Sequence, residues 1–179
     1  GDEDSLSWFY KELSGRLTAK AVLGPDAKDD KSVRILNRIV TYSDNELRYE
    51  ADRRHAEIIV SNIGLKGDNV KTVTTPGLKR TRESEKASAP LAAQQATRDG
   101  SLVMRANYMA ADRPDIQFSC KELARTMSDP GQADWEALKR LGRYLKGRPR
   151  LVIRFRFQEP VDYLDAWTDS DWAGCIKTR

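Results

Sequence analysis

The sequence contains few of the residues from which metal centres and nucleophilic sites are usually built. Among 179 residues there is one histidine, His55, and there are two cysteines, Cys120 and Cys175. A lone histidine excludes a multi-histidine metal site, and no serine or cysteine next to it suggests a catalytic triad. We therefore expect His55 to be a surface or packing residue. Two cysteines provide neither a disulfide framework nor a metal-ligand spacing.

Long apolar runs are also lacking. No segment approaches the length of about 20 residues that a membrane-spanning helix needs, and no signal peptide is recognisable. Hydrophobic residues make up 39% of the chain and charged residues 32%, which is typical of a soluble globular protein with a thin core. We expect an intracellular protein, cytoplasmic or nuclear, with no membrane partner. Because the chain starts at Gly1 rather than at a methionine, we also expect it to be a segment of a longer polypeptide.

The most regular pattern in the sequence lies between residues 113 and 156. Apolar residues recur there at helical spacing in two sets: Ile116, Cys120, Leu123 and Met127, followed by Trp135, Leu138, Leu141 and Leu145. Asp112 is expected to cap the first helix, and Asp129-Pro130 to end it. The pattern predicts two helices joined by a tight turn, with the Cys120 thiol buried and inert.

Positive charge is concentrated in the second of these helices and in the strand after it. The net charge of +4 is too small to indicate a nucleic-acid partner, but residues 139–156 contain eight basic residues and no acidic one. Such a block can contact phosphates, or it can be an ordinary solvated helix face. The candidate nucleic-acid-binding residues are Lys139, Arg140, Arg143, Lys146, Arg148 and Arg150.

The remaining patterns predict an α+β fold: an N-terminal β-hairpin with flanking helices, a helical middle and a C-terminal pair of strands. The expected helices are 5–17, 53–62 (capped by Asp52) and most of 91–111, which Asp99-Gly100 interrupts or starts. The expected strands are 19–23, 33–42, 47–51, 151–157 and 161–168. The expected division is 1–77, a flexible linker 78–92, a helical region 93–150, and 151–179.

Six segments in order carry a family resemblance. They are residues 35–38 with the hairpin, 52–65, Thr75-Pro76-Gly77, 107–116 with its Arg113-Pro114-Asp115-Ile116, 135–147 with its Arg143-Tyr144-Leu145-Lys146-Gly147, and 168–174 with its Asp169-Ser170-Asp171. Together they resemble the C-terminal part of a Ty1/copia-type retrotransposon reverse transcriptase, running into the start of its ribonuclease H domain. Asn37 departs from the pattern, because this hairpin position is usually glycine.

The resemblance implies a late palm hairpin (1–77), a thumb and connection region (93–150) and a truncated ribonuclease H-like start (151–179). It implies Asp169 as the first catalytic and metal-binding carboxylate, effective only with the rest of that domain. The parent enzyme would use Mg²⁺ at paired carboxylates, but the sequence contains no Tyr-x-Asp-Asp motif, so neither active site is complete and no tightly bound metal is expected.

Two functions therefore remain open. In the first, the chain is a segment of an RNA-directed DNA polymerase and ribonuclease H polyprotein that grips a DNA duplex or RNA–DNA hybrid and contacts the rest of the Pol polyprotein. In the second, it is a decayed or domesticated remnant that acts as a protein-interaction module. The second function predicts an exposed apolar patch around Trp135 and Trp172 and internal pairing of the basic face with Glu122, Asp134 or Glu136. The alternative to a catalytic role for Asp169 is that Asp169 and Asp171 form a plain polar cluster at a strand end.

Overall fold

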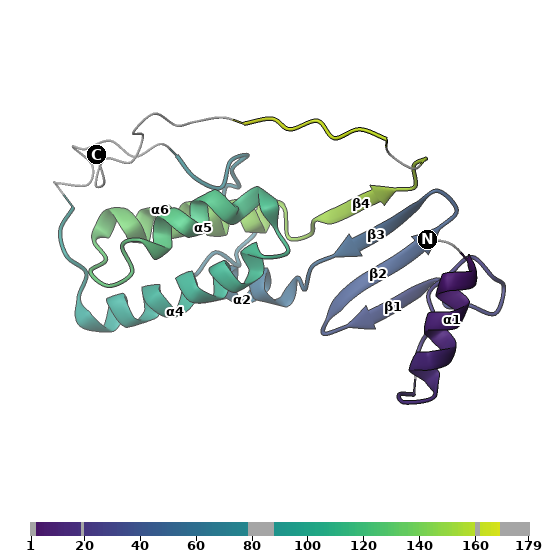
Figure 1. The fold of residues 1–179 in the computed structure, drawn as a ribbon. Helices are drawn as coiled ribbons and strands as arrows, with labels where there is room; N and C mark the ends of the chain where they lie inside the picture. Colours follow the sequence, from purple (N-terminus) through teal and green to yellow (C-terminus); the bar gives the residue numbers. More distant parts are fainter. Residues whose placement is uncertain (1–2, 19, 79–87, 160–161, 169–179) are drawn as a thin grey trace. The chain divides into compact units, whose positions relative to one another are not determined.

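The fold combines a β-sheet with a group of packed helices (Figure 1). The computed structural model describes residues 3–18, 20–78, 88–159 and 162–168. It divides into two compact units, residues 1–49 with 153–157 and residues 50–152 with 158–179. The expected α+β class is confirmed. Residues 50–77 share a unit with the helices of 93–147.

The sheet has four strands in the order β1-β2-β3-β4: β1 Ser32–Ile35, β2 Arg38–Ser43, β3 Glu46–Glu50 and β4 Val152–Arg156. The prediction of one strand over 33–42 is wrong, because Leu36 and Asn37 make a two-residue turn between β1 and β2. Both turn residues have positive φ, 48° and 65°, as a type I′ hairpin turn requires. Asn37 tolerates this conformation without glycine.

The second hairpin agrees with the sequence, since a two-residue turn at Asp44-Asn45 joins β2 to β3. The strand predicted over residues 151–157 is present as β4. Its aromatic residue Phe155, and Phe157 just after it, are exposed. Two other predictions are wrong. Residues 162–168 form no strand, and residues 20–23 contribute only an isolated bridge from Leu23 to Asp30.

Helix α1, Glu3–Ser14, confirms the first predicted helix but not its packing. Its apolar side chains were expected to pack, yet no residue of α1 is buried. The exposed residues are Leu6, Trp8, Phe9, Tyr10 and Leu13.

The helical unit contains α2 Arg54–Asn62, α4 Ala93–Ala110, the 3₁₀ turn η1 Pro114–Ile116, α5 Gln117–Ala124 and α6 Gln132–Gly147. Figure 1 shows α5 lying along α6, with α4 beside them. The two predicted apolar sets lie in a single core: Ile116, Cys120, Leu123, Trp135, Leu138, Leu141 and Leu145 are buried, and Met127 is partly buried against them. The same core contains Leu102, Val103, Ala106 and Met109 of α4.

Three local predictions in this unit are wrong. α4 runs through Asp99-Gly100 without a break, since Asp99 is buried inside the unit instead of capping a turn. The residue that precedes η1 is Arg113, so Asp112 is not its N-cap. α5 ends at Ala124, five residues before Asp129-Pro130. In α2, Ile59 is buried as expected, whereas Ile58 points outward.

A glycine allows α2 and α6 to pack closely. A Cβ atom at Gly142 would lie 3.1 Å from Leu65 Cδ1 and would overlap Ile63 Cδ1. The chain leaves α2 through Gly64, which has a φ of 76°, a conformation that glycine adopts readily at the end of a helix. Because of this close approach, the buried side of α6 is held against α2 and the basic residues of α6 lie on its other faces.

Candidate nucleic-acid interface

Helix α6 begins at an unusual cap. The N-cap residue is Gly131, and the serine hydroxyl at this end comes from Ser88, whose Oγ accepts a hydrogen bond from the Ala133 backbone at 2.9 Å. The buried Asp134 carboxylate accepts bonds from the Gly131 backbone at 2.8 Å and from the Thr126 hydroxyl at 2.6 Å. These bonds satisfy backbone N–H groups that a helix start leaves unpaired, so the first turn of α6 is well held.

Three of the six predicted phosphate contacts hydrogen-bond to side chains within the described part of the chain. Lys139 Nζ lies 2.8 Å from Glu136 Oε1 and above the Trp135 ring, and Arg140 donates to the Thr75 hydroxyl at 2.7 Å. Arg150 makes two bonds to the Glu50 carboxylate, at 2.6 and 2.7 Å, and these bonds lower the pKa of Glu50 below its usual value. Lys139 and Arg150 therefore carry their charge beside a carboxylate, which reduces their attraction for phosphate.

Three predicted cations at the C-terminal end of α6 have no such neutralisation. In the described part of the chain, no ion pair involves Arg143, Lys146 or Arg148. Lys146 donates to the Gly67 carbonyl, and the Arg148 guanidinium lies 5.9 Å from the centre of the Tyr144 ring. The cluster of Arg143, Lys146 and Arg148, which we call the α6 cluster, is the part of the predicted interface that keeps its charge.

A buried arginine, Arg113, hydrogen-bonds to the backbone next to this cluster. Arg113 is almost fully buried, and its guanidinium makes two bonds to the Asp115 carboxylate, at 2.9 and 2.7 Å. It also donates to the backbone carbonyls of Arg148 at 3.1 Å and Pro149 at 3.4 Å, while the Tyr144 hydroxyl donates to Asp115 at 2.9 Å. This network, which we call the Arg113 clamp, connects the start of η1 to the chain that leaves α6.

The clamp also perturbs two pKa values. Burial raises the pKa of the Asp115 carboxyl, but the hydrogen bonds and charge of Arg113 outweigh it, so the pKa lies below its usual value. Burial and the bond to Asp115 raise the pKa of Tyr144. Two of the family motifs contain Arg113, Asp115 and Tyr144, but neither motif predicts a role for these residues. Tyr144 is 29 residues from Asp115 in the sequence, so no periodic pattern could predict their contact.

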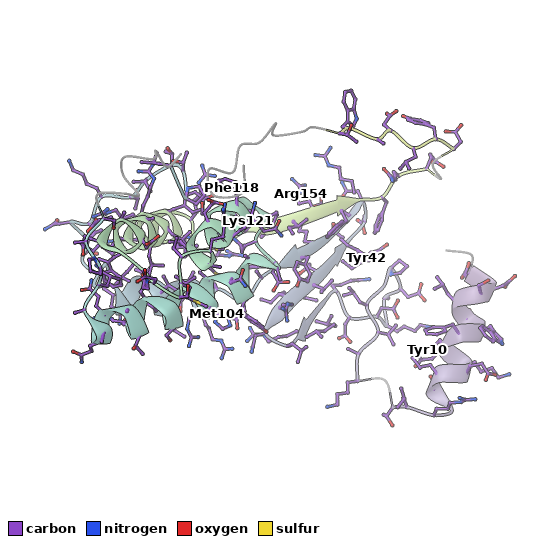
Figure 2. All side chains as sticks on the ribbon, turned by 60° about the vertical axis from the view of Figure 1, so that its left-hand side comes forward. Tyr10, Tyr42, Met104, Phe118, Lys121 and Arg154 are labelled. Carbon is purple, nitrogen blue, oxygen red and sulfur yellow. The ribbon has the colours of Figure 1, made fainter. Side chains whose placement is uncertain are left out.

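A second cationic site lies on the sheet, and sequence reasoning did not propose it. The Glu46 carboxylate is fully buried, and Arg48 Nε donates to it at 2.6 Å. Arg154, labelled in Figure 2, donates to the same carboxylate at 3.0 and 2.7 Å. These hydrogen bonds, that of Arg154 being the largest effect, lower the pKa of Glu46. The only sequence signal was the alternation of arginine and apolar residues in β4.

The remaining candidates contribute no site within the described residues. Asp169 lies outside them, so its predicted metal-binding role is not placed. Across the residues that the structure describes, no group of three or more His, Cys, Asp or Glu side chains could hold a metal ion. Burial raises the pKa of the Cys120 thiol to about 12, and His55 packs against Tyr108 with its Nδ1 3.1 Å from Arg105, as expected for packing residues. No helix in the same described residues is long and apolar enough to cross a membrane.

Comparison with known proteins gives several relatives. The chain is 32% identical over 127 residues to the uncharacterized mitochondrial protein AtMg00810 of Arabidopsis thaliana, covering 70% of this chain and 50% of that protein. It is 34% identical over 104 residues to the retrovirus-related Pol polyprotein from transposon RE1 of Arabidopsis thaliana, covering 58% of this chain and 7% of the polyprotein. To the Pol polyprotein from transposon TNT 1-94 of Nicotiana tabacum it is 28% identical over 137 residues, 72% of this chain and 10% of the polyprotein.

The chain thus spans half of the mitochondrial relative and a tenth or less of these two polyproteins. No family model matches the chain, and no solved structure matches it.

Proposed function

The chain is a relative of the Ty1/copia-type retrotransposon Pol polyproteins, and on this premise we propose that it holds the template–primer duplex of a polymerase by contacting phosphates with the α6 cluster. The observation that carries the proposal is that Arg143, Lys146 and Arg148 stand together at the end of α6 with no carboxylate partner among the described residues. Cations placed this way contact the phosphate backbone without recognising base sequence.

The packing of α6 supports this role. The buried side of the helix and the Arg113 clamp hold its end in one position, and the cluster occupies the last turn and the C-cap of α6, where Arg143 and Lys146 are half-buried and Arg148 is exposed. A rigid support lowers the entropy lost when the cations bind phosphate. Lys139 and Arg150 would contribute less, because the carboxylates of Glu136 and Glu50 lie beside their charges. Arg140 bonds to the neutral Thr75 hydroxyl.

The proposal extends to the parent protein. The duplex would be an RNA–DNA hybrid or a DNA duplex, and the rest of the Pol polyprotein would be the protein partner. Mg²⁺ would be held by carboxylates outside this chain, with Asp169 contributing only when the other carboxylates of a ribonuclease H domain are present. A magnesium ion stabilises the charge that develops on phosphate oxygens during bond cleavage. The function of this chain is then to hold the duplex.

Salt-dependent binding of the full 179-residue chain to a fluorescein-labelled RNA–DNA hybrid tests the proposal. Three phosphate contacts give a slope of about −2.7 in log affinity against log salt, so anisotropy titrations should show affinity falling by at least about 40-fold between 50 and 200 mM KCl. The variant Arg143→Gln/Lys146→Gln/Arg148→Gln should lose this part of the slope. No binding at 50 mM, or binding that salt does not weaken, would contradict the proposal.

The control variant removes the same charge elsewhere. Lys11→Gln/Lys20→Gln/Lys28→Gln neutralises three exposed lysines of the first 49 residues, none of which belongs to α6 or to a strand. It should keep the wild-type slope to within about one contact. If the control weakens binding as much as the α6 variant does, the attraction depends on net charge alone and the cluster is not the contact site.

A protein-interaction module remains the second candidate, and one observation favours it. The Lys139–Glu136 ion pair is the kind of internal pairing which that function predicted. The expected exposed patch is absent at Trp135, because Trp135 is buried in the helical core. Trp172 lies outside the described residues. The binding experiment separates the two candidates, since an interaction module would not bind the hybrid in a salt-dependent way.

A further inference from the structure

Arg148, the residue at which α6 ends, is held by both polar groups of its backbone. Its N–H donates to the Tyr144 carbonyl at 2.9 Å, and its carbonyl accepts a bond from the Arg113 guanidinium at 3.1 Å. Its φ and ψ are −136° and 66°, outside the helical region, so the chain turns away from the helix here. These bonds fix the direction in which the Arg148 side chain leaves α6.

The Arg148 guanidinium lies over an aromatic ring. Its Cζ atom is 5.9 Å from the centre of the Tyr144 ring, within the roughly 6 Å at which a cation is attracted to a ring face. Arg148 is exposed, and its side chain forms no hydrogen bond or ion pair among the described residues. A guanidinium that meets a ring through its flat face keeps the N–H donors in its plane available to another partner.

The ring of Tyr144 is itself fixed. Tyr144 is 4% exposed and belongs to the helical core, and its hydroxyl donates to the Asp115 carboxylate at 2.9 Å. Asp115 is bonded in turn to Arg113, the residue that also donates to the Arg148 carbonyl. The four residues form a closed ring of contacts, and Tyr144 connects the buried core to an exposed cation.

We propose that Tyr144 is a positioning residue for Arg148, and that the oriented guanidinium binds a phosphate of the duplex backbone through two parallel N–H donors. The proposal rests on the proposed function and deepens it, since it gives one cation of the α6 cluster a distinct role. Arginine donors match phosphate oxygens in pairs, which a lysine ammonium cannot do. Orienting one long side chain in advance is worth about 3- to 10-fold in affinity.

The neighbouring cations are not held in this way. Lys146 donates to the Gly67 carbonyl, and the Arg143 side chain has no ring contact among the described residues. Arg150 has its in-plane donors bonded to both oxygens of the Glu50 carboxylate. Of the described arginines in residues 139–156, Arg148 is therefore the one whose face lies over a ring while its donors stay open.

A double-mutant cycle in the full 179-residue chain tests the proposal, with anisotropy titrations of the fluorescein-labelled RNA–DNA hybrid at 50 to 200 mM KCl. Tyr144→Leu removes the ring and should weaken binding about 3- to 10-fold while keeping the salt slope, because the Arg148 charge remains. Arg148→Gln should instead lower the magnitude of the slope by about 0.9. In the Arg148→Gln background, Tyr144→Leu should change the affinity by less than about twofold.

The matched background is Arg143→Gln, which removes a cation of the same cluster that has no ring contact in the described structure. Tyr144→Leu should still weaken binding about 3- to 10-fold there. If its effect is the same in the Arg148→Gln and Arg143→Gln backgrounds, Tyr144 acts through the structure of α6 alone; this proposal is then overturned and the proposed function stands. If the wild type does not bind at 50 mM KCl, both proposals fail.

A second variant leaves the core unchanged, since Tyr144 is buried and its replacement can unfold the chain. Circular dichroism at 25 °C first checks that each variant is folded. Arg148→Lys, at an exposed position, keeps the charge and the salt slope but loses the paired donors, so it should bind about 3- to 10-fold more weakly than wild type. If Arg148→Lys binds as tightly as wild type, the proposal is wrong whether or not Tyr144→Leu folds.

Discussion

Replacing Arg113 by methionine would remove the guanidinium at the centre of the clamp while filling much of its volume. The Asp115 carboxylate would keep only the Tyr144 hydroxyl as a side-chain partner, and the carbonyls of Arg148 and Pro149 would lose their donor. Removing one partner of a buried ion pair costs about 3–5 kcal/mol. Because the Asp115 side chain is 19% exposed, water can partly solvate it, and we expect the lower end, about 3 kcal/mol.

That loss is large for a chain of this size. Typical free energies of unfolding are about 5–15 kcal/mol, and for about 150–250 residues each kcal/mol shifts Tm by about 2–4 °C, so Tm should fall by about 6–12 °C. Urea unfolding followed by circular dichroism at the helical signal measures the loss directly, since α4, α5 and α6 share the affected core. Arg113→Lys should recover only part of it, because an ammonium group cannot bind the carboxylate through two parallel N–H donors.

The same substitution at a half-buried arginine outside the clamp provides the control. Arg143→Met lies on α6 without an ion pair among the described residues, so it should change the free energy of unfolding by no more than about 0.5 kcal/mol. In a double-mutant cycle, Arg113→Met and Asp115→Asn together should cost less than the sum of the single variants by at least about 1 kcal/mol. A loss below about 1 kcal/mol for Arg113→Met would refute the assignment of the clamp as a stabilising connection.

Two further predictions concern packing and acid stability. Gly142→Ala gains about 1 kcal/mol of helix propensity, but the new Cβ overlaps Ile63, and overpacking costs about 1–3 kcal/mol. Urea unfolding should therefore show a net loss of stability of up to about 2 kcal/mol. A gain in stability would show that α2 moves away without cost. The folded-state pKa values of Asp115 and Glu46 lie below the ordinary values of 3.8 and 4.5. The two carboxylates therefore stabilise the fold fully at a pH above these ordinary values, and this stabilisation is lost as the pH falls toward the folded-state pKa values. Urea midpoints measured from pH 7 to pH 3 should therefore drop below about pH 4.5, and Asp115→Asn should flatten the drop; a midpoint that does not fall would contradict the pKa directions.

The helices were predictable where a single periodicity decides the outcome. Leu138, Leu141 and Leu145 recur at helical spacing, and burying them requires only that α6 present one side to a core. Turns and breaks were less predictable, because tertiary packing overrides local preference. Leu36 adopts a positive φ against its intrinsic tendency because the two strands it joins pair with each other, and Asp99 stays helical because it is enclosed by the unit.

The candidate site shows the same division. The sequence correctly concentrated positive charge in residues 139–156, because charge is a property of composition. It could not show which cations keep that charge, since Glu50 pairs with Arg150 and Glu46 with Arg154 across 100 and 108 residues. Such pairs carry no local pattern, and they separate the α6 cluster from the paired arginines of the basic block.

The long separation between β3 and β4 has a consequence for the chain as it is made on the ribosome. Arg150 is synthesised 100 residues after its partner Glu50, which at about 5–20 residues per second is a delay of roughly 5–20 s. During that time β1, β2 and β3 exist but the outer edge of β3 has no strand to pair with. Charged side chains discourage such an edge from joining another chain. Glu46, Arg48 and Glu50 alternate along β3, so a set of charges that includes Glu46, the later partner of Arg154 on β4, also protects the nascent sheet until β4 arrives.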